Sequence, residues 1–149
     1  AFSHFCLLAA ARQGYSGVED TNALAQSALG FPNDTKWYHG RPVMVTRNDY
    51  QVALFNGDVG ICLDLNKEGL RVYFPSMHEY RDFTPSRVPQ HETAFAMTIH
   101  KSQGSEFEEV LIILPESNSR VLEKSLLYTG ITRAKKHVTL WGKKETLMA

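Results

Sequence analysis

The sequence lacks several features that would point to particular classes of protein. Of its 149 residues only two are cysteines, Cys6 and Cys62, and both lie in apolar runs without a partner at metal-ligand spacing. We therefore expect buried free thiols in a reducing compartment, not a disulfide framework or a metal site. No apolar run reaches the length of a membrane span. The 16 basic residues equal the 16 acidic ones, so no overall field favours a nucleic-acid partner, although a local basic track remains compatible.

Two further absences concern nucleotide chemistry. The chain has no phosphate-binding loop of the G-x-x-x-x-G-K-[ST] type, because Gly142-Lys143 lacks both the upstream glycine and a following Ser or Thr. No acidic residue ends an apolar strand where it could hold magnesium, since Glu108 and Glu109 precede one. The sequence also opens on Ala1, without a methionine or a leader peptide. We therefore expect part of a longer protein, with half of a nucleotide-hydrolysis site at most.

What is present is a large apolar fraction, 43%, much of it in strand-length runs. Residues 94–97 and 110–114 read as buried strands, and 4–11 as a third, although a helix fits that run as well. Residues 18–29 and 121–134 follow the helical period, and a last strand ends at Trp141 after starting near Val138. Strands that alternate with helices predict an α/β domain with a parallel sheet.

The middle of the chain has a different pattern. Short strand-like runs alternate there with turn clusters rich in Asn, Asp and Gly, and no helical period interrupts them. The runs are 42–47, 59–65, 70–74, 80–83 and 86–88. Several short strands joined by turns predict a small antiparallel β-barrel, inserted into the α/β chain between residues 37 and 90.

The polar loop between two of the buried strands carries the densest chemistry. It reads Thr98-Ile99-His100-Lys101-Ser102-Gln103-Gly104-Ser105-Glu106-Phe107. A glycine lets backbone N–H groups approach an anion, and a carboxylate accepts from sugar hydroxyls. Hydroxyl, imidazole and ammonium groups donate to phosphate. An ordinary polar surface loop fits this stretch equally well.

A second polar stretch decides between these two interpretations. It reads Leu126-Leu127-Tyr128-Thr129-Gly130-Ile131-Thr132-Arg133-Ala134-Lys135-Lys136 and precedes the last strand. In this order, and separated by one strand and one helix, the two stretches resemble motifs V and VI of superfamily-one DNA helicases. An arginine such as Arg133 can neutralise charge on a transferring γ-phosphoryl group, and the alternative is a cap on the helix end. Arg12 has the same possible role on a shorter motif.

Further stretches extend the resemblance over nearly the whole chain. They are 37–50 (WYHGRPVMVTRNDY), 54–61 (LFNGDVGI) and 91–107. These stretches resemble RecD, the family of exodeoxyribonuclease V alpha subunits, and the stand-alone RecD-like helicases are its near neighbours.

This resemblance implies an α/β architecture with two parts. Residues 1–36 and 91–149 would form a RecA-like, P-loop NTPase-type domain, the second motor domain, and 37–90 an inserted SH3-like barrel. It also implies a motor that moves 5′ to 3′ on single-stranded DNA with ATP and Mg²⁺. Such a motor works beside beta and gamma subunits in a complex that repairs double-strand breaks in the bacterial cytoplasm. No tightly bound cofactor and no metal site are expected in this chain itself.

The resemblance implies roles for single residues as well. Arg133 falls on the γ-phosphate, and Arg12 matches the motif IV arginine. The nucleotide-binding positions are Gln103, Gly104 and Glu106, with Glu106 towards the ribose. The residues expected at DNA are Thr98 and His100, which match positions that face it, and Lys101, Ser102 and Arg47 as further donors. The alternative is a module that binds DNA or partner subunits through the barrel while the motif residues stay idle.

Overall fold

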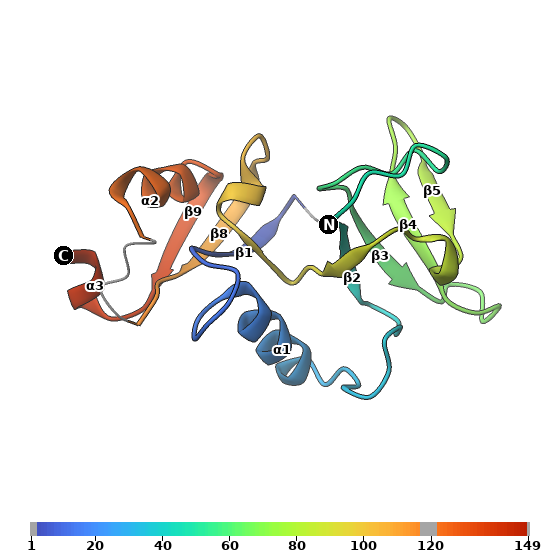
Figure 1. The fold of residues 1–149 in the computed structure, drawn as a ribbon, viewed down its shortest axis with the longest axis horizontal. Coiled ribbons are helices and arrows are strands. Elements are labelled where there is room, and N and C mark those ends of the chain that lie inside the picture. The colour runs from blue at the N-terminus through green and yellow to red at the C-terminus, as the bar shows by residue number, and fades with distance from the viewer. Residues whose placement is uncertain (1–2, 117–121, 149) are drawn as a thin grey trace. The chain divides into compact units, whose positions relative to one another are not determined.

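The computed structural model describes residues 3–116 and 122–148 of the chain. The chain forms two compact units, one made of Ala1–Ala25 with Phe95–Ala149 and the other of Gln26–Ala94. In Figure 1 the first unit holds the blue and orange strands, and the second holds the teal to yellow-green ones. Each unit has a hydrophobic core of its own.

The first unit is built on a parallel sheet of four strands in the order β7-β1-β8-β9. The strands are β1 (Phe5–Ala9), β7 (Ala96–Thr98), β8 (Phe107–Ile113) and β9 (Ala134–Trp141). In the centre, Leu8 pairs with Met97 on one side and with Ile112 on the other. Leu8 and Ile112 are fully buried, as is usual for inner strands of a parallel sheet. The expected α/β fold with a parallel sheet is confirmed.

Two helices lie on opposite faces of this sheet (Figure 1). The helices of the unit are α1 (Val18–Ala28), α2 (Lys124–Ile131) and the short α3 (Lys144–Met148). Asn22 ties α1 to β7, because the Ala96 N–H donates to Asn22 Oδ1 at 2.8 Å and Asn22 Nδ2 donates to the Ala96 carbonyl at 3.4 Å. On the other face, α2 packs Leu126 into the core with Ile112. The crossover through α1 leads from β1 to β7, and the one through α2 leads from β8 to β9, in the opposite direction across the sheet. Because both crossovers are right-handed, the two helices lie on opposite faces.

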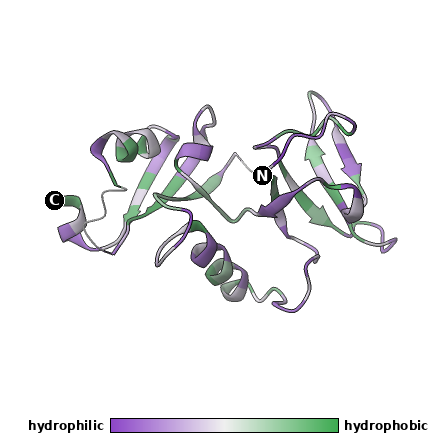
Figure 2. Cartoon of the chain, viewed as in Figure 1, coloured by the Kyte–Doolittle hydropathy of each residue, from purple (hydrophilic) through white to green (hydrophobic). Residues whose placement is uncertain are grey.

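The second unit is an antiparallel sheet in the order β5-β4-β3-β2-β6. Its strands are β2 (Pro42–Val45), β3 (Val59–Leu63), β4 (Arg71–Pro75), β5 (Tyr80–Phe83) and β6 (His91–Thr93). The inner strand β3 is largely green in Figure 2, whereas the edge strands β5 and β6 are purple. Polar edge strands discourage pairing with other chains. Val43, Val72 and Phe74 lie in the core of this unit.

One strand of the second unit differs from the expectation. Residues 86–88, expected as a strand, fall largely in the 3-10 turn η1 (Pro85–Arg87). Proline at position 85 fixes its own φ and lacks the N–H that a sheet ladder needs. The closing strand is β6 instead, which pairs with β2. The antiparallel sheet therefore extends past residue 90, where the barrel is expected to end.

In the first unit, the helix before the last strand ends earlier than expected. α2 ends at Ile131 and β9 already begins at Ala134, ahead of the expected start near Val138. The first half of β9 is a Lys-Lys-His run on an edge strand, so it has no apolar alternation that would mark it in the sequence. Val121, the expected start of the helix, lies outside the described residues.

Both cysteines are buried and free, so the expectation of buried free thiols is confirmed. Burial raises the pKa of the Cys6 thiol to about 12, so this thiol stays protonated at neutral pH and is a poor nucleophile. Across residues 3–116 and 122–148, the helices are too short or too polar to cross a membrane.

Candidate functional site

The connection from β7 to β8 crosses the parallel sheet within residues 99–106. Ile99 is fully buried in the core, and η2 (His100–Ser102) follows it as a single 3-10 turn. Because β7 and β8 run in the same direction, the connection starts at the carboxyl end of one strand and finishes at the amino end of the other. Its first and last residues therefore lie at opposite ends of the parallel strands. We call these two sides of the sheet the carboxyl edge and the amino edge.

Two hydroxyl groups build the turn at the start of this connection. The Ser102 hydroxyl has no exposed surface and donates to the Ile99 carbonyl at 2.6 Å. Thr98 Oγ1 accepts from the Lys101 N–H at 3.2 Å. The enclosed side chain of Ser102, whose donor is used inside the turn, argues against the expected contact with DNA. His100 and Lys101 are exposed, as contact with a ligand requires.

The end of the connection presents the predicted nucleotide-binding residues at the amino edge of the sheet. Gln103, Gly104 and Glu106 are all exposed. Gly104 has φ +83°, a left-handed conformation that favours glycine, and a Cβ at this position would meet no atom within 4 Å. The turn thus needs glycine for its backbone, and open space lies over its peptide groups.

Arg133 lies at the same edge, between α2 and β9. Its guanidinium donates from Nη1 to the Ser105 carbonyl at 3.2 Å, from Nε to the Thr129 carbonyl at 3.1 Å, and from Nη2 to Thr132 Oγ1 at 3.3 Å. The Phe107 N–H donates to the Arg133 carbonyl at 2.8 Å. The two polar motifs, far apart in sequence, therefore meet here, and the guanidinium also caps the end of α2.

Arg12 lies at the opposite, carboxyl edge of the sheet. It follows β1; its carbonyl accepts from the Glu19 N–H at 3.2 Å, and its Nε lies 3.5 Å from Glu19 Oε1 at the start of α1. The five residues of β1 separate the two edges by roughly 16 Å. The parallel strands therefore hold Arg12 and Arg133 at different ends of the sheet, and the catalytic role expected of Arg12 stays a prediction.

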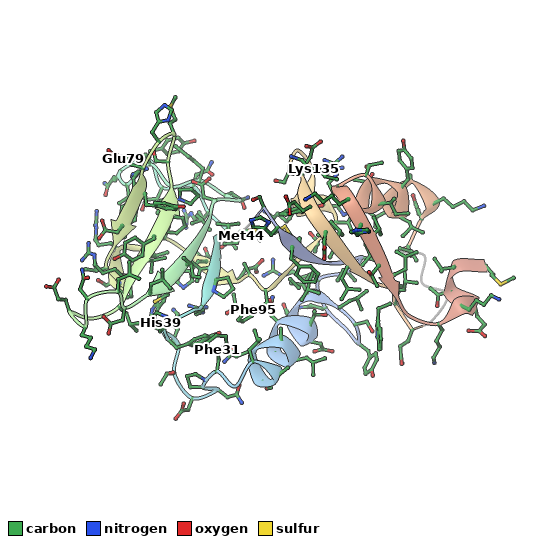
Figure 3. All side chains as sticks on the ribbon, turned by 180° about the vertical axis from the view of Figure 1, so that it is seen from behind. Phe31, His39, Met44, Glu79, Phe95 and Lys135 are labelled. Carbon is green, nitrogen blue, oxygen red and sulfur yellow. The ribbon has the colours of Figure 1, made fainter. Side chains whose placement is uncertain are left out.

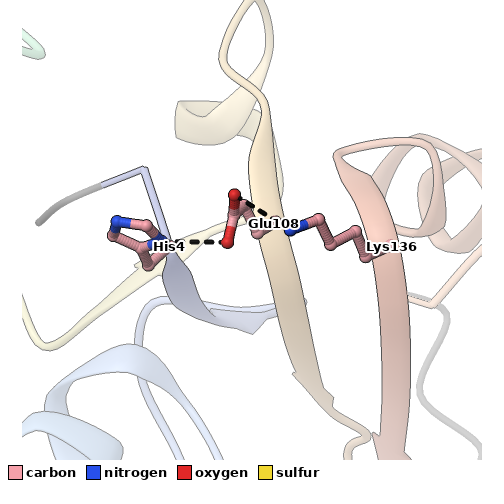
Figure 4. Close-up of polar contacts among 3 residues, drawn as sticks. All are labelled: His4, Glu108 and Lys136. Carbon is pink, nitrogen blue, oxygen red and sulfur yellow. Dashed lines mark hydrogen bonds and ion pairs between the residues drawn. The ribbon is translucent and has the colours of Figure 1, made fainter.

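Charged side chains surround the amino edge (Figure 4). His4 Nδ1 lies 2.9 Å from Glu108 Oε2, and Lys136 Nζ lies 3.2 Å from Glu108 Oε1. The hydrogen bonds with His4 and Lys136 hold the pKa of the Glu108 carboxyl below its usual value. Lys135, labelled in Figure 3, has its Nζ 3.4 Å from Glu106 Oε2. The sequence does not reveal these pairs, since they depend on the pairing of β8 with β1 and with β9.

Arg47 is exposed at the start of the loop after β2. It belongs to the second unit, whereas every other predicted site residue belongs to the first. In the part of the chain that the structure describes, no three His, Cys, Asp or Glu side chains gather where they could hold a metal ion.

Comparison with known proteins adds to this geometry. The family of the UvrD-like helicase C-terminal domain matches residues 93–141, which run from β6 to β9. The RecBCD enzyme subunit RecD of Haemophilus influenzae is 44% identical over 147 residues, which cover 95% of this chain and 22% of that protein. This chain is a RecD-like segment.

The RecD-like segment is also similar to the ATP-dependent RecD2 DNA helicase of Deinococcus radiodurans, at 34% identity over 64% of the segment and 13% of that protein. It further resembles a solved structure of the Pif1 helicase from Bacteroides in complex with ADP-AlF3 and single-stranded DNA. That likeness covers 93% of the segment and 40% of the Pif1 chain, with a TM-score of 0.59 and 20% identity, and shows the fold alone. The RecD-like segment spans less than a quarter of either curated relative.

Proposed function

We propose that this chain is the C-terminal motor region of an ATP-dependent helicase that moves 5′ to 3′ on DNA. The helicase would be the RecD subunit of exodeoxyribonuclease V, acting in double-strand-break repair and recombination. Similarity to a RecD subunit over 95% of the chain supports this assignment. The similarity to RecD2 is weaker and covers 64% of the chain, so a stand-alone RecD-like helicase is the second candidate.

One observation carries the proposal, namely the meeting of two motifs at the amino edge of β8 and β9. Arg133 contacts Ser105 there, and both Gly104 and Glu106 neighbour that contact in sequence. A guanidinium can neutralise charge on a γ-phosphoryl group, and a carboxylate can accept from ribose hydroxyls. A glycine turn exposes peptide N–H groups to an anion. We assign Arg133 to catalysis, and Gln103, Gly104 and Glu106 to nucleotide binding.

ATP and Mg²⁺ fit these residues in part. The amino edge offers an arginine and a carboxylate, but the chain has no G-x-x-x-x-G-K-[ST] loop that could cradle phosphates. We therefore assign the phosphate cradle and the magnesium ligands to a first RecA-like domain elsewhere in the polypeptide. ATP supplies the phosphoryl group whose transfer to water drives such a motor.

The present partners of Arg133 explain how it would reach a phosphate. Its guanidinium donates to two carbonyl oxygens and one hydroxyl, all of them neutral. Hydrogen bonds from a guanidinium to phosphate are charged on both sides and are stronger than those to neutral acceptors. A phosphate at the amino edge would therefore draw the guanidinium from the end of α2, while the Ser105 contact keeps it near the nucleotide turn until then.

Single-stranded DNA is assigned to the carboxyl edge, where the connection from β7 begins. Thr98 ends β7, and His100 and Lys101 are exposed directly after it. Their side chains can donate to phosphate oxygens. The same short connection carries Gly104 to the other edge, so DNA and nucleotide would bind at the two ends of one segment. Arg47 would add a phosphate contact from the second unit.

The architecture proposed for these roles has two parts. Residues 1–36 and 91–149 would form the second RecA-like motor domain, and 37–90 an inserted SH3-like barrel. The parallel sheet with helices on both faces and the antiparallel 5-stranded sheet support this division. The beta and gamma subunits of exodeoxyribonuclease V are the proposed partners, and the bacterial cytoplasm is the proposed location.

The test uses the full-length protein. ATP hydrolysis is measured with and without single-stranded DNA, and unwinding is measured on duplexes with a 5′ or a 3′ tail. We expect hydrolysis that DNA stimulates, unwinding from the 5′ tail alone, and co-purification with the beta and gamma subunits. Hydrolysis and unwinding without that association would favour a stand-alone helicase. DNA binding without any hydrolysis would overturn the motor and leave a binding module.

A further inference from the structure

The loop between β2 and β3 presents two aromatic rings to solvent. Tyr50 is 78% exposed and Phe55 is 40% exposed. Their ring centroids lie 5.6 Å apart with an angle of 69° between the planes, an edge-to-face arrangement that stabilises both rings. The two rings therefore support each other, while most of the Tyr50 side chain remains open to solvent.

The backbone of this loop is held by its own side chains. Asp49 and Leu54 exchange backbone hydrogen bonds at 2.8 and 3.1 Å, which closes the turn that carries Tyr50. Asp49 Oδ1 accepts from the Gln51 N–H at 2.9 Å, directly after Tyr50. Asp58 Oδ2 accepts from the Phe55 N–H at 2.8 Å. Both aromatic residues are thus held by a carboxylate at or beside their own peptide groups.

The rest of the second unit holds the loop as well. Val52 and Leu54 are buried in the core of this unit. Arg81 on β5 donates from Nη1 to the Ala53 carbonyl at 3.0 Å and from Nη2 to the Val52 carbonyl. Groups that are already ordered lose less conformational entropy when a ligand binds. The loop therefore resembles a rigid support for the exposed Tyr50 ring.

The surroundings of Tyr50 suit a nucleobase better than an apolar protein surface. Large contiguous apolar patches mark protein docking sites, whereas the apolar exposed neighbours here are only Ala53 and Phe55, and they lie among the polar Asn48, Gln51 and Asn56. A nucleobase needs only the face of one ring, because every base can stack on an aromatic side chain. Arg47 is exposed three positions before Tyr50 in the chain and can donate to a phosphate.

The charges of the loop indicate where the affinity would come from. Arg47 of the loop and Arg81 of β5 together balance Asp49 and Asp58, so these groups have no net positive charge that would attract a polyanion. Arg81 is already used by backbone carbonyls. Stacking on Tyr50 would then supply most of the binding at this loop, and Arg47 would add one phosphate contact.

We propose that Tyr50 stacks on a base of single-stranded DNA and that Phe55 is the positioning residue that holds the Tyr50 ring. The inference rests on the proposed function, because it adds a contact to the DNA strand that the motor is proposed to bind. It concerns base stacking in the second unit, separate from the phosphate contacts assigned to the first.

The test uses the full-length protein and a labelled single strand of DNA, with Kd measured by fluorescence anisotropy over a range of salt concentrations. We expect Tyr50→Ala to weaken binding by about 5- to 150-fold, the range for loss of one stacked base. Tyr50→Phe keeps the ring and should bind like the wild type. Tyr80→Ala is the matched control, since Tyr80 lies in the same unit and is 73% exposed.

Salt dependence separates stacking from charge. Tyr50→Ala should keep the wild-type salt slope, because stacking neutralises no phosphate, whereas Arg47→Ala should make the slope shallower by about 0.7. On a strand with abasic sites, Tyr50→Ala and the wild type should bind alike. Phe55→Ala should weaken binding to normal DNA with no change in salt slope.

The outcomes distinguish the inference from the proposed function. A wild type that does not bind single-stranded DNA would overturn both. A wild type that binds while Tyr50→Ala binds equally tightly would overturn the stacking contact alone. If Tyr50→Phe weakens DNA binding as much as Tyr50→Ala does, the hydroxyl group and not the ring makes the contact, and the stacking proposal is overturned. If Tyr50→Ala binds DNA normally but no longer associates with the other subunits, the stacking contact is overturned in favour of a protein partner. Thermal melting verifies that each variant is folded.

Discussion

The guanidinium of Arg133 donates to the carbonyl oxygen of Ser105, 3.2 Å away. This contact joins the residues after α2 to the glycine turn before β8, and the Phe107 N–H reinforces it by donating to the Arg133 carbonyl at 2.8 Å. The position of the arginine relative to the nucleotide turn is therefore set by the backbone at the amino edge, and it depends on how closely α2 packs on the sheet.

Replacing Arg133 should remove catalysis in the full-length protein while largely sparing DNA binding. An arginine that stabilises charge on a transferring phosphoryl group contributes about 10³–10⁵ in kcat, and Arg133→Lys should restore little, because an ammonium lacks the planar fork. Arg133→Ala should also cost about 1–2 kcal/mol of stability, since its hydrogen bonds to the end of α2 are lost. Rates of ATP hydrolysis, Kd for DNA and Tm are measured together. An Arg133→Ala variant that melts at a lower Tm but hydrolyses ATP at the normal rate would show that Arg133 only caps the end of α2.

Arg12 offers a matched control for this experiment. Its side chain lies at the carboxyl edge and pairs with Glu19, so Arg12→Ala should not reproduce the loss of hydrolysis caused by Arg133→Ala at saturating DNA. A loss of the same size would show that Arg12 also acts in hydrolysis.

Ser102→Ala should reduce stability without changing DNA affinity. The hydroxyl is buried and donates to the Ile99 carbonyl at 2.6 Å, and loss of such a bond costs about 0.5–1.5 kcal/mol. The carbonyl keeps the Ser102 N–H as a donor at 3.1 Å, which limits the effect. The free energy of unfolding and the Kd for single-stranded DNA are compared with those of His100→Ala, an exposed residue of the same turn. Weaker DNA binding by Ser102→Ala at unchanged stability would contradict the enclosed position.

Gly130→Ala should lower Tm, although alanine favours a helix over glycine by about 1 kcal/mol. A Cβ at this position would lie 3.0 Å from Ile112 Cδ1 and 3.2 Å from Ile99 Cδ1, and both isoleucines are fully buried. Crowding in a packed core typically costs about 1–3 kcal/mol. The shift of α2 should also slow ATP hydrolysis by displacing Arg133. Ser125→Ala, an exposed change in the same helix, is the control. A higher Tm for Gly130→Ala would contradict this prediction and show that the two isoleucine side chains can move to make room for the Cβ.

His91 should make the second unit sensitive to mild acid. Its Nδ1 lies 2.7 Å from the Pro89 carbonyl, and its Nε2 lies 3.4 Å from Arg41 Nη1. Burial lowers its pKa below the ordinary 6.5, and the charges of Arg41 and Lys36 lower it further, although the hydrogen bond to Pro89 opposes them.

A histidine whose pKa is lower in the folded state than in the unfolded state binds its proton more tightly when unfolded. The stability that neutral His91 contributes is therefore complete above pH 6.5 and is lost as the pH falls from there through the folded pKa. Thermal unfolding of wild type and His91→Gln is compared between pH 7.5 and pH 5. The loss of stability should be smaller in His91→Gln, and identical pH profiles would contradict this role for His91.

The 149-residue chain by itself should hydrolyse no ATP, because it has no phosphate loop and no magnesium carboxylate. Phosphate release is measured with and without single-stranded DNA. If the purified chain hydrolyses ATP and Arg133→Ala abolishes this activity, the prediction is wrong.

Local patterns in the sequence predicted the elements whose burial and turn chemistry are decided by near neighbours. Apolar runs marked β1 and β8, the helical period marked α1, and the φ of Gly104 agrees with the turn that a glycine indicates in a polar loop. The residue types at Arg133 and Glu106 likewise indicated phosphate and sugar chemistry before any fold was known. These features depend on a few consecutive residues, so they can be found in one sequence.

Only the tertiary structure decided which of these residues come together. Arg12 and Arg133 lie at opposite edges because β1 and β8 pair in parallel, with Leu8 opposite Ile112, and no local pattern encodes that pairing. The Ser102 hydroxyl points inward because the connection must cross the sheet on a buried Ile99. The edge strand β6 and the first half of β9 carry polar residues and are recognised only once their partners are known. Strand order and direction arise from contacts between distant parts of the chain. These contacts determine at which end of the sheet each side chain lies and can therefore act.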